Sequence, residues 1–341
     1  MTINRTVFGS FRFWIVLAYG CLFLAFLPHS LQRQETLGID FPIFYSAAQN
    51  HGVTNGYIYP PLFSFLLYPL SLLPLSVAIV GWYLIQAVAL LIVLWYTTPL
   101  TLRGTQFIVA LLFQLAVVWT TILNAELGQV NTVILLLLLL TIRYEHKKRG
   151  ALSLGIASAI KLSPSIFLPF LLFRTTSRRW LTALVWIATI ALSIFVPMMA
   201  GYSVSGLTQL VEVSQTPGQN IGIPSILPEI WKYLVIALCL ASIYIGYRSP
   251  HRNELWYVPV LLMIICPPFL RKAHLITGVL LGSAVGSSRR LVSYVPVLWA
   301  IGSLGTMLWS SSAIVGTTAA LLVLLVELMR TDSSQVRNVL Q

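Results

Sequence analysis

Apolar runs of about twenty residues recur along almost the whole of this 341-residue chain. A helix that crosses the hydrocarbon core of a bilayer needs about twenty apolar residues, because each residue adds about 1.5 Å. Only 9% of the residues are charged, whereas a soluble domain carries about a quarter. The sequence therefore predicts an all-α polytopic membrane protein. Runs of full or nearly full length cover residues 11–28, 76–97, 105–123, 180–199, 230–247, 291–309 and 312–329, and shorter runs cover 128–142, 255–268 and 273–288.

One further apolar segment, residues 150–173, is interrupted at Lys161-Leu162-Ser163-Pro164. Pro164 cannot sit inside a helix without the loss of a backbone hydrogen bond, so the segment is expected to break there. If the N-terminus is cytoplasmic and this segment returns to the side it entered from, 16 of the 21 Lys and Arg fall in cytoplasmic segments. Cytoplasmic loops carry such an excess, and a single crossing would invert every later loop. The sixteen are Arg5, Arg12, Arg103, Arg143, Lys147, Lys148, Arg149, Arg174, Arg178, Arg179, Arg248, Arg252, Arg289, Arg290, Arg330 and Arg337.

We therefore expect a bundle of about ten full spans plus a broken helical hairpin, with both termini in the cytoplasm. Residues 1–330 form one transmembrane domain with long outer loops at 29–75 and 200–229, and residues 331–341 form a cytoplasmic tail. The net charge of +12 is explained by these short basic loops, so nucleic acid is not expected as a partner. The expected location is the cell membrane, with several passes and with membrane lipids as neighbours.

The first outer loop carries a conspicuous acid, Asp40, followed by Phe-Pro-Ile-Phe-Tyr-Ser-Ala-Ala. Asp is a good residue at a helix start, and Pro42 suits the first turn, so Asp40 could simply cap a short interfacial helix. The next stretch, Tyr57-Ile58-Tyr59-Pro60-Pro61, has the aromatic and proline content of an interfacial anchor. Spacing alone leaves a structural and a functional interpretation open for both segments.

Together with two later blocks, these segments resemble a known family. The later blocks are Gly128-Gln129-Val130-Asn131 and the stretch from Gly155 to Lys161-Leu162-Ser163-Pro164. Their order resembles glycosyltransferase family 87, membrane glycosyltransferases of the GT-C type that include polyprenyl-phosphate-mannose-dependent mannosyltransferases. The resemblance covers about residues 36–175. A later Pro-Pro…His274 stretch lacks the Trp and the His pair of the family's block.

The resemblance implies a GT-C-like bundle that transfers a hexose, mannose in the mannosyltransferases, from a polyprenyl-phosphate donor. The acceptor would be a lipid or glycan hydroxyl on the extracytoplasmic face, and the reaction would invert the sugar. Asp40 corresponds to the family's proposed general base. No cofactor and no metal are implied if basic side chains hold the lipid phosphate. The candidate substrate-binding residues are Lys161, Arg271 and His274 for the phosphate, and Gln129, Asn131 and Tyr59 for the sugar.

Each of these assignments has a plainer alternative. Lys161 could extend its side chain to the nearer interface, and His274 could be a hydrogen-bonded core histidine. Gln129 and Asn131 could merely cap the next helix, and Glu126 is a reserve candidate for the base. Three other classes of protein also remain open. These are a secondary transporter, a membrane polymerase or ligase of surface glycans, and a non-catalytic or degenerate family member.

Overall fold

The computed structural model describes residues 10–37, 40–100, 102, 104–175, 179–206, 209, 231–249, 252–265, 272–285, 287, 289–308 and 312–339. Every regular element within these ranges is helical, as the apolar runs predict. The elements are α2 (Phe11–Leu37), α3 (Asp40–Gln49), α4 (Pro61–Ser71), α5 (Leu75–Thr97), α6 (Thr105–Leu127), α7 (Asn131–Arg143), α8 (Lys148–Ile160), η1 (Ser163–Phe167), α9 (Leu168–Arg174), α10 (Arg179–Met199), α13 (Trp231–Arg248), η2 (Asn253–Trp256), α14 (Tyr257–Ile265), η3 (Lys272–Ala284), α15 (Arg290–Gly305) and α16 (Ser312–Val339).

Five helices in the described ranges are long and apolar enough to cross a membrane, namely α2, α5, α6, α10 and α16. The other apolar helices are shorter. Helix α7, for example, has 13 residues. At about 1.5 Å per residue it spans roughly 20 Å, less than the roughly 30 Å of a hydrocarbon core. The expected count of about ten full spans is therefore not confirmed by helix length.

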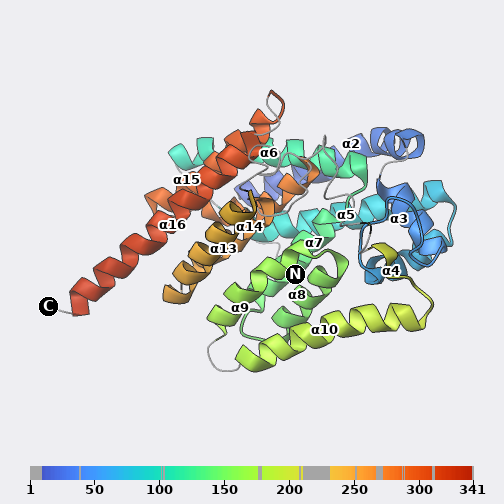
Figure 1. The fold of residues 1–341 in the computed structure, drawn as a ribbon. Helices are drawn as coiled ribbons and strands as arrows, with labels where there is room; N and C mark the ends of the chain where they lie inside the picture. Colours follow the sequence, from blue (N-terminus) through green and yellow to red (C-terminus); the bar gives the residue numbers. More distant parts are fainter. Residues whose placement is uncertain are drawn as a thin grey trace, which may run out of the picture.

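The segment expected to form the first outer loop, residues 29–75, is more helical than its polar and proline-rich sequence suggests. Helix α2 continues through Pro28 to Leu37 instead of ending with the apolar run at residue 28. Helix α3 begins at Asp40, whose carboxylate thus lies in the first turn, where a negative charge is favourable. Helix α4 follows Pro60 and has Pro61 at its first position, where a missing N–H costs nothing. Figure 1 shows α3 and α4 together at one end of the molecule, far from the end of α16.

Helices α7 and α8 form a hairpin, and η1 and α9 then continue the chain from the end of α8. Helix α8 ends at Ile160, and Lys161 is extended, with φ −148° and ψ 133°. Its Nζ reaches Asn131 at the start of α7. At the other end of the hairpin, Arg174 at the end of α9 bonds Glu145, which precedes α8. The segment from α8 to α9 therefore returns to the end of the molecule where it began, as the expected broken hairpin does.

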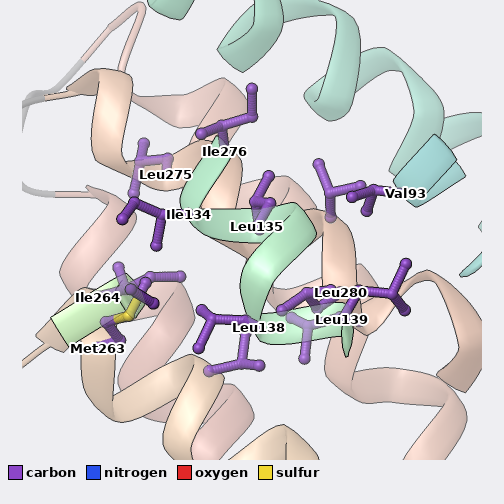
Figure 2. Packing of buried hydrophobic residues seen from close by; sticks show 14 of the residues in the cluster. Val93, Ile134, Leu135, Leu138, Leu139, Met263, Ile264, Leu275, Ile276 and Leu280 are labelled. Atoms are coloured by element: carbon purple, nitrogen blue, oxygen red, sulfur yellow. The ribbon is translucent and has the colours of Figure 1, made fainter. Parts of the chain in front are cut away.

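The hydrophobic core surrounds α7. Figure 2 shows Leu275 and Ile276 of η3 beside Ile134 and Leu135, and Leu280 beside Leu139. The chain direction of η3 thus matches that of α7, so the start of η3 lies toward the start of α7. Close helix contacts depend on glycine elsewhere in the core. A Cβ at Gly278 would lie 2.1 Å from the Trp299 ring.

Candidate functional site

The structure brings Asp40, Gln129 and Tyr59 into one hydrogen-bonded cluster. The Gln129 side-chain NH2 donates to the Asp40 carboxylate. The Tyr59 hydroxyl donates to the Gln129 Oε1 at 3.1 Å. Gln129 and Tyr59 are buried, whereas Asp40 is half-buried. A buried amide thus contacts the carboxylate of a residue that is itself half-buried.

A sharp turn at the end of α6 places Gln129. Gly128 adopts the left-handed conformation with φ 67°, and its N–H caps the helix by bonding the carbonyls of Asn124 and Ala125. A left-handed residue at this position is usually glycine, because a Cβ would strain it. The Trp82 indole N–H donates to the Gly128 carbonyl at 2.7 Å, and its ring stacks on Phe41, 5.8 Å away at 16°. Trp82 therefore contacts both the turn before Gln129 and the residue after Asp40.

A second cluster connects Lys161 with the same turn. The Lys161 Nζ donates to the Asn131 Oδ1 at 2.8 Å, and the Asn131 NH2 donates to the Asn124 Oδ1 at 3.1 Å. The Asn124 NH2 lies 3.5 Å from the Gln129 carbonyl. Asn131 and Asn124 are 2% and 1% exposed, whereas Lys161 is half-buried. A carboxylate and an ammonium group are therefore supported by one buried amide network at the same end of α7.

The chain after α10 covers the Tyr57–Pro60 segment. A Cβ at Gly206 would lie 2.4 Å from the Tyr59 carbonyl, and the ring of Tyr202 stacks on that of His51 at 4.9 Å. The Tyr57 hydroxyl donates to the Pro60 carbonyl at 3.0 Å. Burial raises the pKa of the Tyr57 phenol, so this hydroxyl stays protonated and able to donate. The chain from Tyr202 to Gly206 thus supports the backbone that carries Tyr59.

The remaining candidates are Glu126, His274 and Arg271. Glu126, in the last turn of α6, is 3.2 Å from the His29 imidazole of α2. The half-buried His274 lies near the start of η3, and its carbonyl accepts from Thr277 at 2.9 Å. Arg271 falls outside the described residues. Glu126 is therefore placed with His29 rather than in the Asp40 cluster.

Three supporting residues were not singled out from the sequence: Trp82, Gln86 and Asn124. Gln86 lies inside a long apolar run and Asn124 directly follows another, and both amides are 1% exposed. Buried polar groups need hydrogen-bond partners, so an amide inside a span is itself a signal for a polar network. The sequence contains that signal, although the family motifs mark only two amides, Gln129 and Asn131.

A separate cavity of about 400 Å³ lies at the opposite end of α7. Its lining includes Glu145, Arg174, Asn253 and Trp256, and none of the predicted site residues. Glu145 accepts from the Arg174 Nε at 2.9 Å and from the Trp256 indole at 2.6 Å. This ion pair joins the chain before α8 to the end of α9.

The site contains a carboxylate, that of Asp40, and an ammonium group, that of Lys161, each of which contacts a buried amide. A carboxylate with an accessible oxygen can take a proton from a hydroxyl. An ammonium group can stabilise a phosphate that gains negative charge. Both functional ends are partly exposed, and the groups that orient them are buried, which is the arrangement that keeps reactive groups in a fixed geometry.

Comparison with known proteins agrees with the resemblance seen in the motifs. A polyprenol-phosphate-mannose-dependent alpha-(1-2)-phosphatidylinositol pentamannoside mannosyltransferase of Mycolicibacterium smegmatis is 24% identical, over 78% of this chain and 75% of its own length. No solved structure matches the chain. Residues 57–285 match the model of Glycosyltransferase family 87. This range includes Tyr59, Gln129, Asn131 and Lys161. Because this match covers more than half of the chain, the protein belongs to Glycosyltransferase family 87.

Proposed function

We propose that this protein transfers a hexose, most simply mannose, from a polyprenyl-phosphate donor to a hydroxyl of a lipid or glycan acceptor. Family membership supports the glycosyl transfer, and the name of the Mycolicibacterium relative supports the donor class. The observation that carries the proposal is the buried amide network, which joins Asp40 to Lys161 at one end of α7. We place this end on the extracytoplasmic side, because the basic loops belong to the other end.

In the proposed reaction, the acceptor oxygen attacks the sugar's anomeric carbon while the bond from that carbon to the phosphate oxygen breaks. Asp40 takes the acceptor's proton as the new bond forms. The polyprenyl phosphate leaves with the electron pair of the broken bond, and Lys161 stabilises its charge. A single displacement of this kind inverts the anomeric configuration. His274 and Arg271, near the start of η3, are proposed to assist at the phosphate.

The contacts of Gln129 and Asn131 favour an orienting role for both amides. The NH2 of Gln129 is directed to Asp40, and its oxygen accepts from Tyr59. The oxygen of Asn131 accepts from Lys161, and its NH2 is directed to Asn124. These contacts occupy both ends of each amide. We therefore propose that Gln129, Tyr59 and Asn131 orient the base and the cation, instead of binding the sugar as first expected.

The Asp40→Asn variant tests the proposed base. Asn keeps an oxygen that can accept from Gln129 and suits the helix start about as well, so the fold should be retained. An amide cannot act as the base, so turnover should fall by roughly 10²- to 10⁴-fold. The measurement is transfer from purified polyprenyl-phosphate mannose to lipid acceptors, with a melting curve for each variant. Glu126→Gln is the matched control and should retain activity.

Three results would contradict parts of this proposal. Transfer by Asp40→Asn at the wild-type rate would remove Asp40 as the base, and loss of activity in Glu126→Gln would assign that role to Glu126. Transfer from polyprenyl-phosphate glucose in preference to mannose would change the sugar and leave the mechanism intact. A wild-type protein that transfers from no polyprenyl-phosphate sugar would favour the degenerate or transporter alternatives.

A further inference from the structure

Asn124 occupies the junction between the two halves of the proposed site. Its side-chain oxygen accepts from Asn131, the residue that bonds Lys161. Its NH2 lies 2.8 Å from the Gln86 Oε1 and 3.5 Å from the Gln129 carbonyl. Its backbone carbonyl accepts from the N–H of Gln129 at 3.1 Å. One fully buried residue therefore contacts two sets of hydrogen bonds. The first, here called the cation branch, leads through Asn131 to Lys161. The second, here called the base branch, is the turn that carries Gln129, the partner of Asp40.

The charge of Lys161 determines the direction of these hydrogen bonds. An ammonium group has donors only, so Asn131 must present its oxygen to Lys161 and its NH2 to Asn124. Asn124 then presents its oxygen to Asn131 and its NH2 to Gln86. The cation branch thus requires an oxygen from Gln86.

The base branch makes the opposite demand on Gln86. With its amide turned, the Gln86 NH2 would donate to the Gln129 carbonyl at 2.7 Å, and its oxygen would accept from the Trp82 indole at 2.9 Å. That orientation removes the acceptor for Asn124. Gln86 therefore bonds Asn124 in one amide orientation and the Gln129 carbonyl in the other.

We propose that Asn124, together with Gln86, is a positioning unit that fixes Lys161 and the Gln129 turn relative to each other. This inference rests on the proposed glycosyl transfer, for which the spacing of base and cation must match the acceptor hydroxyl and the donor phosphate. Neither residue touches the reacting atoms. Asn124 acts on donor affinity through Asn131 and Lys161, and on turnover through Gln129 and Asp40.

The Asn124→Leu variant removes both connections while it keeps a side chain of similar size. We expect kcat to fall about 10- to 100-fold, since a misplacement of about 1 Å costs on that order. Donor Kd, measured with polyprenyl-phosphate mannose in detergent, should rise at least about threefold, within the usual range for coupled neighbours. In a double-mutant cycle, Lys161→Gln should weaken donor binding less in the Asn124→Leu background than in the wild type.

Two further variants separate positioning from a general loss of structure. Gln114→Leu removes another buried amide of α6, ten residues before Asn124. The Oε1 of Gln114 has no hydrogen-bond partner among the described residues. It should leave kcat and donor Kd within about twofold of the wild type. Gln86→Met removes the oxygen to which Asn124 donates, so it should raise donor Kd and lower kcat in the same direction as Asn124→Leu, by smaller factors. Gln86→Met also carries the test if Asn124→Leu does not fold.

The outcomes distinguish this inference from the proposed function. If the wild type transfers sugar and Asn124→Leu and Gln86→Met behave like Gln114→Leu, the positioning inference is wrong and the proposed function stands. Strictly multiplicative effects in the cycle with Lys161→Gln would also overturn the inference. If the wild type neither binds nor transfers from any polyprenyl-phosphate sugar, the proposed function itself is wrong.

Discussion

Substitutions of Lys161 can separate a structural role from a functional role. Its ammonium group should affect the stability of the protein in the first role and the affinity for the donor in the second. In the structural role it donates to the Asn131 Oδ1 at 2.8 Å, and Asn131 is only 2% exposed. In the proposed functional role it binds the donor phosphate. Replacement by Gln preserves an NH2 donor for Asn131 and removes the charge. Replacement by Met removes both.

The expected magnitudes follow from these contacts. In Lys161→Met, the buried oxygen of Asn131 loses its donor, which should lower the free energy of unfolding by about 1–3 kcal/mol. Lys161→Gln should be destabilised less. Donor affinity should fall in both variants, because a hydrogen bond to a charged group contributes about 1.5–3 kcal/mol. That free energy corresponds to a Kd increase of about 10- to 150-fold.

The assay is equilibrium binding of polyprenyl-phosphate mannose to purified protein, with a melting curve for each variant. Lys148→Gln is the matched control, since it removes an exposed cation at the opposite end of the α7–α8 hairpin. It should change neither affinity nor stability. Wild-type donor affinity in Lys161→Gln would refute the phosphate role and leave Lys161 as a purely structural donor to Asn131.

Two further predictions address the packing and the topology. Gly278→Ala should destabilise the protein by about 1–3 kcal/mol in thermal unfolding, because its Cβ would lie 2.1 Å from the buried Trp299 ring, whereas Gly20→Ala, with open space at the Cβ, should be neutral. In a background without native cysteines, single cysteines at Asn50 and Gln215 should react with an impermeant thiol reagent from outside, and those at Lys147 and Ser177 should be protected. Labelling of only one of the latter two would contradict the broken-hairpin topology.

The helical class and the break at Lys161 could be predicted from the sequence, because both depend on local properties. Apolar runs must be helical in a bilayer, and Pro164 disfavours a continuous helix beside it. Helix ends were less predictable. Helix α2 continues nine residues beyond its apolar run, since helix formation at an interface does not require apolar side chains. The 3₁₀ geometry of η3 was equally unpredictable from its apolar composition.

The contacts within the site could be predicted only in part. Asp40, Gln129 and Lys161 were identified by family resemblance, which preserves residue types in order along the chain. Their connection through Asn124 and Gln86 depends on which faces of α5 and α6 meet, and no local pattern contains that information. A buried amide in a span signals a partner but does not say which one. The proposed division between orienting and substrate-contacting residues therefore depends on contacts that only the structure provides.

The ion pair between Arg174 and Glu145 joins the two ends of the segment from α8 to α9, at the end opposite Lys161. We take this ion pair as the point about which α8 would tilt. Helix α8 has 13 residues and so acts as a lever arm of roughly 20 Å between that pivot and the site. A tilt of only about 3° at the pivot would displace the tip by about 1 Å, enough to cost on the order of 100-fold in rate. We therefore expect substitutions of Arg174 or Glu145 to reduce activity, although neither residue belongs to the proposed site.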